Sequence, residues 1–163
     1  MAKAALRSLK LDRLLIVPSH RSPLKAERPA PARHRVAMLR LAFKNMPKVG
    51  ISTLELRRPA PSYTVDTLRT LKRRWPEAEL FLIVGADAAR DFRRWRRPGE
   101  IRRLATLAVF PRRGHRIPSG LLRIPMRPVE ASASGIRSGR LLEGGVPTVI
   151  AYARRHRLYA PAP

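Results

Sequence analysis

The sequence predicts an α/β protein with a mostly parallel sheet and helices on both faces, and three observations support this fold class. Short apolar runs without helical spacing recur along the chain, as is typical of strands buried on both faces. Amphipathic segments of helical length separate these runs, so right-handed crossovers between parallel strands are expected. Apolar residues make up 44% of the 163 residues, which excludes wholesale disorder and suits one domain spanning residues 1–163.

The first third of the chain contains two expected helices and two expected strands. Residues 1–10 form a fragment of amphipathic helix. Their basic character also resembles a mitochondrial transit peptide, but no linker separates them from the core. A strand at residues 14–17 ends at a proline, and a helix at residues 32–45 is stopped by Pro47. Residues 49–56 are the next expected strand.

The centre of the chain predicts a helix, a strand, a tight turn and a second helix. Residues 64–74 have helical spacing with Pro76 as a stop, and residues 79–84 are an uninterrupted strand-like run. Gly85 permits a close approach of the backbone to a ligand, and the Asp87 carboxylate can cap the helix that follows. Ligands of open α/β sheets bind at the carboxyl ends of strands, which is where this turn falls. Gly-x-Asp is weak evidence by itself, and the alternative is a plain strand-to-helix turn.

The last third alternates in the same way. Residues 100–104 form a short helix, residues 106–110 a strand and residues 121–126 a further short strand. Residues 132–142 and 147–157 are the last two expected helices. The centre of the sheet is expected to be formed by three strands, at residues 14–17, 81–84 and 107–110.

Positive charge is the unusual feature of the composition. Lys and Arg number 35 against 11 Asp and Glu, which gives a formal net charge of +24. A field of this sign attracts polyanions, so weak, salt-dependent binding to nucleic acid is expected, with residues 93–97 (Arg-Arg-Trp-Arg-Arg) as a stacking patch. No recognised nucleic-acid motif is present. The lack of cysteine excludes disulfides and thiolate metal sites and fits a reducing compartment. No apolar run reaches the length of a membrane span.

Several short motifs follow one another along the chain at characteristic spacings. They are Leu11-Asp12-Arg13 with Val17-Pro18, Pro23 with Lys25, residues 61–67 (Pro-Ser-Tyr-Thr-Val-Asp-Thr), Gly85-Ala86-Asp87 with Trp95, Pro111-Arg112 with Gly114, and residues 132–137 (Ser-Ala-Ser-Gly-Ile-Arg). In this combination the whole chain resembles the bacterial nicotinate-nucleotide adenylyltransferases of the nucleotidyltransferase superfamily. Ser-Tyr-Thr-x-Asp-Thr, followed by Gly-Ala-Asp and Trp, is the specific part of the resemblance.

The resemblance implies a cytoplasmic enzyme of NAD biosynthesis with a Rossmann-like fold. Its reaction is the transfer of adenylate from ATP, with Mg²⁺, to nicotinate mononucleotide, and pyrophosphate leaves. Such chemistry is done by positioning and by neutralising phosphate charge. The resemblance favours the acid mononucleotide over the amide. The residues implied in binding ATP and its phosphates are Lys25, Gly85, Asp87, Ser132, Ser134 and Arg137. Those implied in binding the mononucleotide are Tyr63, Thr64, Trp95 and Arg112.

Each of these residues also has a simpler interpretation. Ser132 or Thr64 could be an N-cap, and Tyr63 a core aromatic residue. Trp95, which in the family stacks on the nicotinate ring, could be a half-buried helix residue. Arg137 could be a solvated charge, and Lys25 one surface lysine among many. The resemblance also gives Asp87 a contact to a ribose or to the pyridine side of the ligand.

Two departures from the family pattern stand out. Ala131 and Ala133 replace an Ile and a Ser of the usual Ile-Ser-Ser-Thr-x-Ile-Arg motif, which removes one hydroxyl that could contact phosphate. The family's His-x-Gly-His, which steadies the reacting phosphate, is absent, so no catalytic residue and no protein metal ligand is assigned. We expect an N-terminally truncated domain that lacks its first strand and therefore has an open sheet edge. The histidines that are present are His20, His34, His115 and His156.

Three hypotheses follow from the sequence. The first is a truncated nicotinate-nucleotide adenylyltransferase with impaired activity. The second is a relative that binds nucleotide without catalysis. The third is a basic nucleic-acid-binding protein on an α/β scaffold, which tight, salt-dependent binding to oligonucleotides without competition from ATP would identify.

Overall fold

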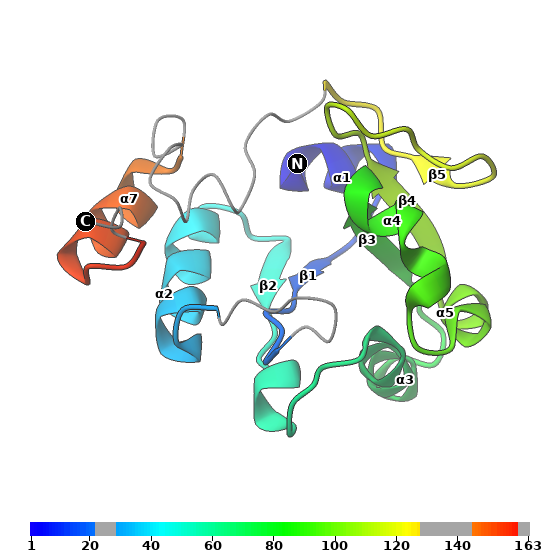
Figure 1. The fold of residues 1–163 in the computed structure, drawn as a ribbon, viewed down its shortest axis with the longest axis horizontal. Coiled ribbons are helices and arrows are strands. Elements are labelled where there is room, and N and C mark those ends of the chain that lie inside the picture. The colour runs from blue at the N-terminus through cyan, green and yellow to red at the C-terminus, as the bar shows by residue number, and fades with distance from the viewer. Residues whose placement is uncertain (22–28, 128–144, 160–163) are drawn as a thin grey trace.

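The computed structural model describes residues 1–21, 29–127 and 145–159, and Figure 1 shows its elements in chain order. The expected helix at residues 132–142 lies outside the described residues. The helices and strands are α1 (Ala2–Ser8), β1 (Leu14–Ile16), α2 (Ala32–Phe43), β2 (Val49–Ile51), α3 (Thr64–Arg74), β3 (Phe81–Gly85), α4 (Ala86–Arg90), α5 (Pro98–Leu104), β4 (Thr106–Phe110), β5 (Leu122–Arg123) and α7 (Pro147–Arg155). Two 3₁₀ turns, η1 (Glu55–Arg57) and η2 (Phe92–Arg94), complete the described elements.

The described strands form two parallel sheets, and this arrangement confirms the predicted fold class. β1 pairs with β2, and the second sheet has the order β3-β4-β5. Within the described residues only β4 has a strand on both sides. The prediction that residues 14–17 and 81–84 are central strands is therefore wrong, because β1 and β3 each pair along one edge. The expectation of an open edge agrees with this pairing.

Helices cover both faces of the three-stranded sheet. Leu107 and Leu82 point to the face covered by α3 and α5, where they join a cluster with Val65 and Ile101. The next residue, Ala108, points to the opposite face and packs against α1. This alternation is the period of two that a pleated strand imposes. The sheet β3-β4-β5 with α1, α3, α4, η2 and α5 is called the three-stranded region below.

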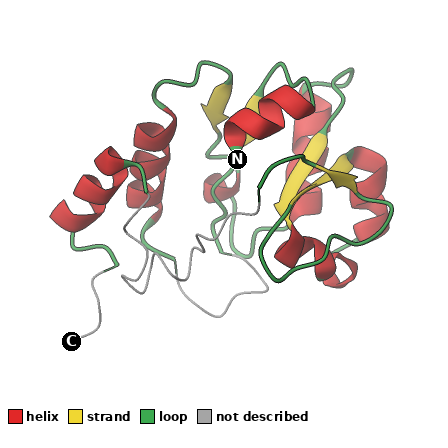
Figure 2. Ribbon diagram, turned by 90° about the horizontal axis from the view of Figure 1, so that it is seen from above, coloured by secondary structure: helices red, strands yellow, loops and turns green. Residues whose placement is uncertain are grey.

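The remaining elements, β1, β2, η1, α2 and α7, are called the two-stranded region. Figures 1 and 2 show α2 and α7 side by side, away from the three-stranded sheet. α2 has no fully buried residue, and in α7 only Ala153 is buried. Aromatic rings join the two helices: the ring centroids of His34 and Tyr152 are 5.9 Å apart, and those of His34 and His156 are 4.9 Å apart.

Several expected elements are shorter in the structure than the sequence suggested. The strand expected at residues 49–56 ends at Ile51, because residues 55–57 turn into η1. The strand expected at residues 121–126 is reduced to β5. β3 is half-buried along its length instead of buried on both faces, since it has a strand neighbour on one edge. No helix in the described part of the chain is long and apolar enough to cross a membrane.

Candidate functional site

The turn after β3 brings a carboxylate and a guanidinium together at the carboxyl end of the sheet. Gly85 is the last residue of β3 and pairs in register with Phe110 of β4. A Cβ atom added at Gly85 would overlap Asp87 Oδ1 and lie 3.2 Å from Arg112 Nε. A side chain at this position would displace the Asp87 carboxylate, so close approach rather than the backbone torsions favours glycine here.

Asp87 and Arg112 form an ion pair beside this turn. Arg112 Nε lies 3.5 Å from Asp87 Oδ1, and the Asp87 side chain is 48% exposed. Asp87 lies in the first turn of α4, where a negative charge is favourable. The predicted cap is wrong, because the N-cap is Gly85 and no side-chain cap hydrogen bond forms. The exposure leaves the Asp87 carboxylate accessible to a ligand from the solvent side.

Two aromatic residues, Tyr63 and Trp95, pack against the core cluster that lies between the sheet and the helices α3 and α5. Trp95 is half-buried, and its ring centroid lies 5.5 Å from that of Phe92. It lies between η2 and α5, so the alternative of a helix tryptophan is wrong. Its neighbour Arg96 places its guanidinium carbon 4.5 Å from the centroid of the Tyr63 ring. Trp95 is thus neither fully buried nor fully exposed.

Tyr63 and Thr64 mark the start of α3. Tyr63 is the N-cap residue and Thr64 the first helical residue, with no side-chain cap hydrogen bond. The alternative of Thr64 as an N-cap is therefore wrong. Tyr63 is partly buried against the core, and its carbonyl accepts the Asp66 N–H at 3.1 Å. The first residue of α3, a helix of 11 residues, therefore follows directly after Tyr63, whose ring lies close to the Arg96 guanidinium.

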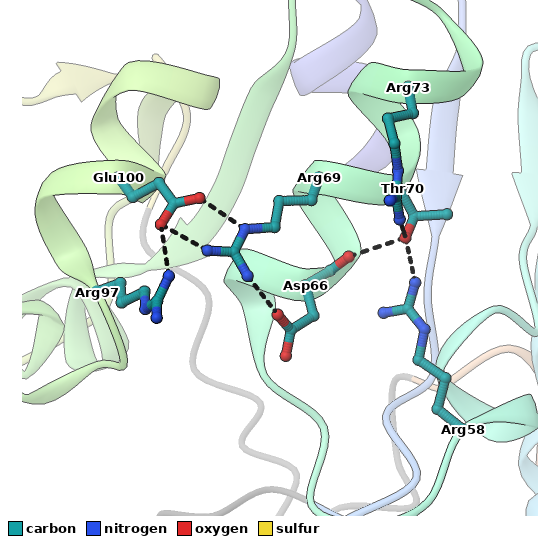
Figure 3. A network of polar contacts seen from close by, with 7 residues as sticks. All are labelled: Arg58, Asp66, Arg69, Thr70, Arg73, Arg97 and Glu100. Carbon is teal, nitrogen blue, oxygen red and sulfur yellow. Dashed lines mark hydrogen bonds and ion pairs between the residues drawn. The ribbon is translucent and has the colours of Figure 1, made fainter.

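A network of ion pairs connects α3 to α5, as Figure 3 shows. Arg69 Nε and Nη2 donate to the two Glu100 oxygens at 2.6 and 2.8 Å, and Arg69 Nη1 donates to Asp66 Oδ1 at 3.1 Å. Arg97 Nη1 lies 3.5 Å from Glu100 Oε2. The hydrogen bond from Arg69 lowers the pKa of Glu100, and the same bond raises the pKa of Arg69. The network fixes the segment that carries Trp95 against α3.

Arg97 adopts a left-handed backbone at the start of α5. Its φ of 53° and ψ of 56° are unusual for a residue that precedes proline, which normally is extended. A non-glycine residue in this region costs about 1–2 kcal/mol. The Arg97 carbonyl accepts the N–H groups of Glu100 and Ile101, both at 3.1 Å. These bonds and the ion pair to Glu100 offset the cost and turn the chain sharply after Trp95.

The described residues do not form a metal site of their own. Among them no group of three His, Cys, Asp or Glu side chains could hold a metal ion. Mg²⁺ generally binds through one or two carboxylates together with substrate phosphates, so a site supplied mainly by a nucleotide needs no such group. Asp87 is the carboxylate of the candidate site described above.

The structure brings together two groups of the residues predicted from the sequence. The first group consists of Gly85, Asp87 and Arg112. The second consists of Tyr63 and Trp95, which pack against one core cluster, and Thr64 follows Tyr63 directly in the chain. The contact between Arg96 and Tyr63 was not predicted from the sequence. The Arg-Arg-Trp-Arg-Arg pattern did single out Arg96, but the contact spans 33 positions and no local pattern encodes it. The remaining predicted residues lie outside the described residues: Lys25, Ser132, Ser134 and Arg137.

Comparison with known proteins identifies first the class and then the family. The model of the cytidylyltransferase-like family matches residues 1–142, and the chain belongs to that family. A protein of Thermomicrobium roseum named as a probable nicotinate-nucleotide adenylyltransferase is 36% identical over 98% of this chain and 83% of the relative. A relative of the same name from Thermus thermophilus is 39% identical over 97% of this chain and 89% of the relative. The chain belongs to the nicotinate-nucleotide adenylyltransferase family.

Solved structures support the same fold. The nicotinic acid mononucleotide adenylyltransferase of Plasmodium falciparum, solved in complex with NaAD, superposes with a TM-score of 0.71. The superposition covers 91% of this chain and 83% of the Plasmodium chain, at 18% sequence identity. At that identity the likeness concerns the fold, which is the Rossmann-like nucleotidyltransferase fold that the sequence predicts.

Proposed function

We propose that this protein transfers adenylate from ATP to nicotinate mononucleotide, and that the products are nicotinate adenine dinucleotide and pyrophosphate. An oxygen of the mononucleotide phosphate forms the new bond to the α-phosphorus of ATP. The bond from that phosphorus to the bridging oxygen breaks, and pyrophosphate leaves with the electron pair. The single observation that carries the proposal is the half-buried Trp95, which packs against the same core cluster as Tyr63 in a chain of the nicotinate-nucleotide adenylyltransferase family.

The described residues have distinct roles in this proposal. Trp95 stacks on the pyridine ring, with Tyr63 and Thr64 at the side of the ring site. Arg112, positioned by its ion pair with Asp87, supplies positive charge to the mononucleotide. Gly85 lets the nucleotide approach the backbone, and the exposed Asp87 accepts a hydrogen bond from a ribose hydroxyl or faces the pyridine side of the ligand.

The polyphosphate of ATP is assigned to residues outside the described part of the chain. Lys25, Ser132, Ser134 and Arg137 supply charge and hydroxyl groups in this proposal, as their motifs suggest. Mg²⁺ enters as the MgATP complex, held by the phosphates of the substrate itself.

The 163 residues by themselves are proposed to turn over slowly. They contain no His-x-Gly-His motif, and removing one donor that stabilises the charge of a reacting group costs about 10²–10³ in rate. The test is the formation of nicotinate adenine dinucleotide from ATP and nicotinate mononucleotide, followed together with pyrophosphate release. The proposal expects slow formation of both products, and rapid turnover would contradict it. Binding of both substrates without any product would favour the relative that only binds nucleotide.

The ring site is tested by comparing the two tryptophans of the chain. Trp95→Ala should weaken the binding of nicotinate mononucleotide by about 1–3 kcal/mol, the usual contribution of an aromatic stacking contact. The binding of ATP should be weakened less. Trp75→Ala is the matched control, because Trp75 caps the far end of α3 under Arg74. Dissociation or Michaelis constants for both substrates provide the measurement. Equal losses in the two variants would refute the stacking role.

Weak, non-specific binding to nucleic acid is also proposed, and the net charge of +24 supports it. It should be independent of sequence and disappear as salt is raised. Fluorescence anisotropy with a labelled oligonucleotide measures it. Tight binding at physiological salt that ATP does not reduce would instead favour the nucleic-acid-binding hypothesis.

A further inference from the structure

We infer that a groove between the last turns of α3 and α5 binds single-stranded nucleic acid, with phosphates in the groove and a base stacked on Arg74. The inference rests on the weak nucleic-acid binding proposed above and gives that binding a place on the molecule. The groove has a volume of about 570 Å³ and is called the α3–α5 groove below. It is lined by Arg69, Lys72, Arg73, Pro76 and Leu104.

The α3–α5 groove lies at the opposite end of the sheet from the proposed ring site. Both helices begin near the ring site, α3 directly after Tyr63 and α5 shortly after Trp95, and both end at the groove. Each of them leads into a strand, so the groove lies toward the amino ends of β3 and β4. The five residues of β3 separate this end from Gly85 by roughly 13 Å. A nucleic-acid strand can therefore occupy the groove without entering the ring site.

The last turn of α3 carries positive charge that the described carboxylates do not neutralise. Arg69 is paired with Glu100 and Asp66 (Figure 3). Within the described residues, neither Lys72 nor Arg73 forms an ion pair with a carboxylate.

These cations have donors to offer a phosphate. Lys72 Nζ donates one hydrogen bond, to the Ala78 carbonyl at 2.9 Å, and an ammonium has three N–H groups. Arg73 is exposed, and its guanidinium can bind two oxygens of one phosphate. The helix end itself carries about half a negative charge, which the three cations of the last turn outweigh. The charge of the groove is therefore complementary to a phosphate backbone.

Arg74 provides a flat surface beside the groove. Its guanidinium carbon lies 5.0 Å from the centroid of the Trp75 ring. Because Arg74 is exposed and Trp75 is half-buried, the indole supports one face of the guanidinium and the other face meets solvent. Unpaired bases stack on aromatic rings and on guanidinium planes. Pro76 follows Trp75 directly and lines the groove, so the stacking surface lies next to the cations.

This combination of charge and flat surface favours a single strand over other polyanions. An acidic peptide offers carboxylates to the cations but has no base to place on Arg74. The bases of a duplex are already stacked and paired, so a duplex would meet the cations alone. Contacts to phosphates and to the faces of bases are insensitive to sequence. The binding should therefore be non-specific, in agreement with the lack of a recognised nucleic-acid motif in the sequence.

The experiment is fluorescence anisotropy of a short labelled oligonucleotide, titrated with the 163-residue chain at several salt concentrations. The test variant combines Arg73→Gln with Arg74→Gln, two exposed arginines of the last turn of α3. The matched control combines Arg154→Gln with Arg155→Gln, two exposed arginines of the last turn of α7, so both variants lose the same charge.

The two variants should differ although their net charges are equal. The affinity for the single strand should fall about 10-fold in the α3 variant and about 2-fold or less in the α7 variant, whose lost charges lie elsewhere on the molecule. The slope of log affinity against log salt should also fall by about 0.7 in the α3 variant, for the lost phosphate contact of Arg73.

Arg74→Lys tests the stacking separately from the charge. Lysine keeps the positive charge but has no flat plane on which a base can stack. Its affinity for the single strand should fall about 3- to 10-fold, while its affinity for a duplex of the same length should stay unchanged. Equal losses for the single strand and the duplex, or no loss for either, would overturn the stacking of a base on Arg74.

The remaining outcomes separate the inference from the binding on which it rests. If the wild type binds no oligonucleotide at low salt, the weak nucleic-acid binding fails and the inference fails with it. If the wild type binds but the α3 variant loses no more affinity than the α7 variant, the inference is overturned while the binding stands. Displacement of the oligonucleotide by nicotinate mononucleotide also overturns it, because the strand would then occupy the ring site.

Discussion

The two regions of the molecule have similar apolar strands but very different cores. In the described residues, every fully buried Val, Leu, Ile and Phe side chain lies in the three-stranded region. The best example is β4, in which Leu107 to Phe110 are all buried. In the two-stranded region every residue of β1 and β2 is only half-buried, and α2 has no fully buried residue. Burial therefore follows from the number of neighbouring elements rather than from the apolar character of a segment.

Polar contacts are prominent where the regions meet. Thr67 Oγ1 donates to Glu55 Oε1 at 2.7 Å, and the Ser62 hydroxyl accepts the His20 N–H at 2.9 Å. Such bonds fix geometry but add only about 0.5–1.5 kcal/mol each to stability. The difference teaches that the proposed ring site lies on the well-buried three-stranded region, while the two-stranded region contributes little apolar burial.

The largest expected effect compares two isoleucines in helices of the two regions. Ile101 of α5 is 1% exposed, so Ile101→Ala should lower the free energy of unfolding by about 2–5 kcal/mol. Ile150 of α7 is half-buried, and Ile150→Ala should cost about 1 kcal/mol, since less apolar area leaves the core. Urea unfolding followed by circular dichroism gives both values. Equal costs would show that the two regions are equally well packed.

The next effect compares two strand glycines. Gly85→Ala should lower the affinity for nicotinate mononucleotide about 10-fold or more, because the new Cβ would displace Asp87 from Arg112. In Gly50→Ala the new Cβ would lie 3.2 Å from Leu15 Cδ2 and 3.3 Å from Arg13 Nη2. Those are side chains that can shift, so binding should be nearly unchanged. Titration of both variants with the mononucleotide provides the test. Equal affinities would show that Asp87 and Arg112 do not contribute to binding the mononucleotide.

The smallest effect is a pH dependence confined to the two-stranded region. Arg33 Nε donates to His34 Nε2 at 3.2 Å, so His34 Nδ1 carries the proton that faces the Tyr152 hydroxyl at 3.0 Å. Burial, Arg33 and His156 lower the pKa of His34 below its usual value of 6.5. A lowered histidine pKa means that the contribution of His34 is present above pH 6.5 and is lost as pH falls.

Hydrogen exchange measures this loss directly. After correction for the intrinsic rate, the α7 amides should exchange faster at pH 5 than at pH 8, while those of β4 should not change. His34→Gln cannot titrate, so it should remove most of the difference. An identical pH response in the variant would show that His34 is not the group responsible.

The sequence allowed much of the fold to be predicted, because local patterns encode it. The bounds of α3 and β4 are those expected, since Pro76 and the apolar run of β4 mark them clearly. Strand pairing depends on neighbours distant in sequence, which explains why β3 was expected to be central and is an edge strand among the described strands. The Arg69–Glu100 network and the Arg96–Tyr63 stack join positions about 30 apart, so no motif could have predicted them.

The central claim is that the ring of nicotinate mononucleotide binds against Trp95 in the three-stranded region. The most direct test is the fluorescence of Trp95 in the Trp75→Phe variant, in which it is the only tryptophan of the chain. The account predicts a saturable change in Trp95 emission as nicotinate mononucleotide is added, because a stacked ring alters the surroundings of the indole. Calorimetric binding of the mononucleotide without any change in Trp95 emission would contradict the claim.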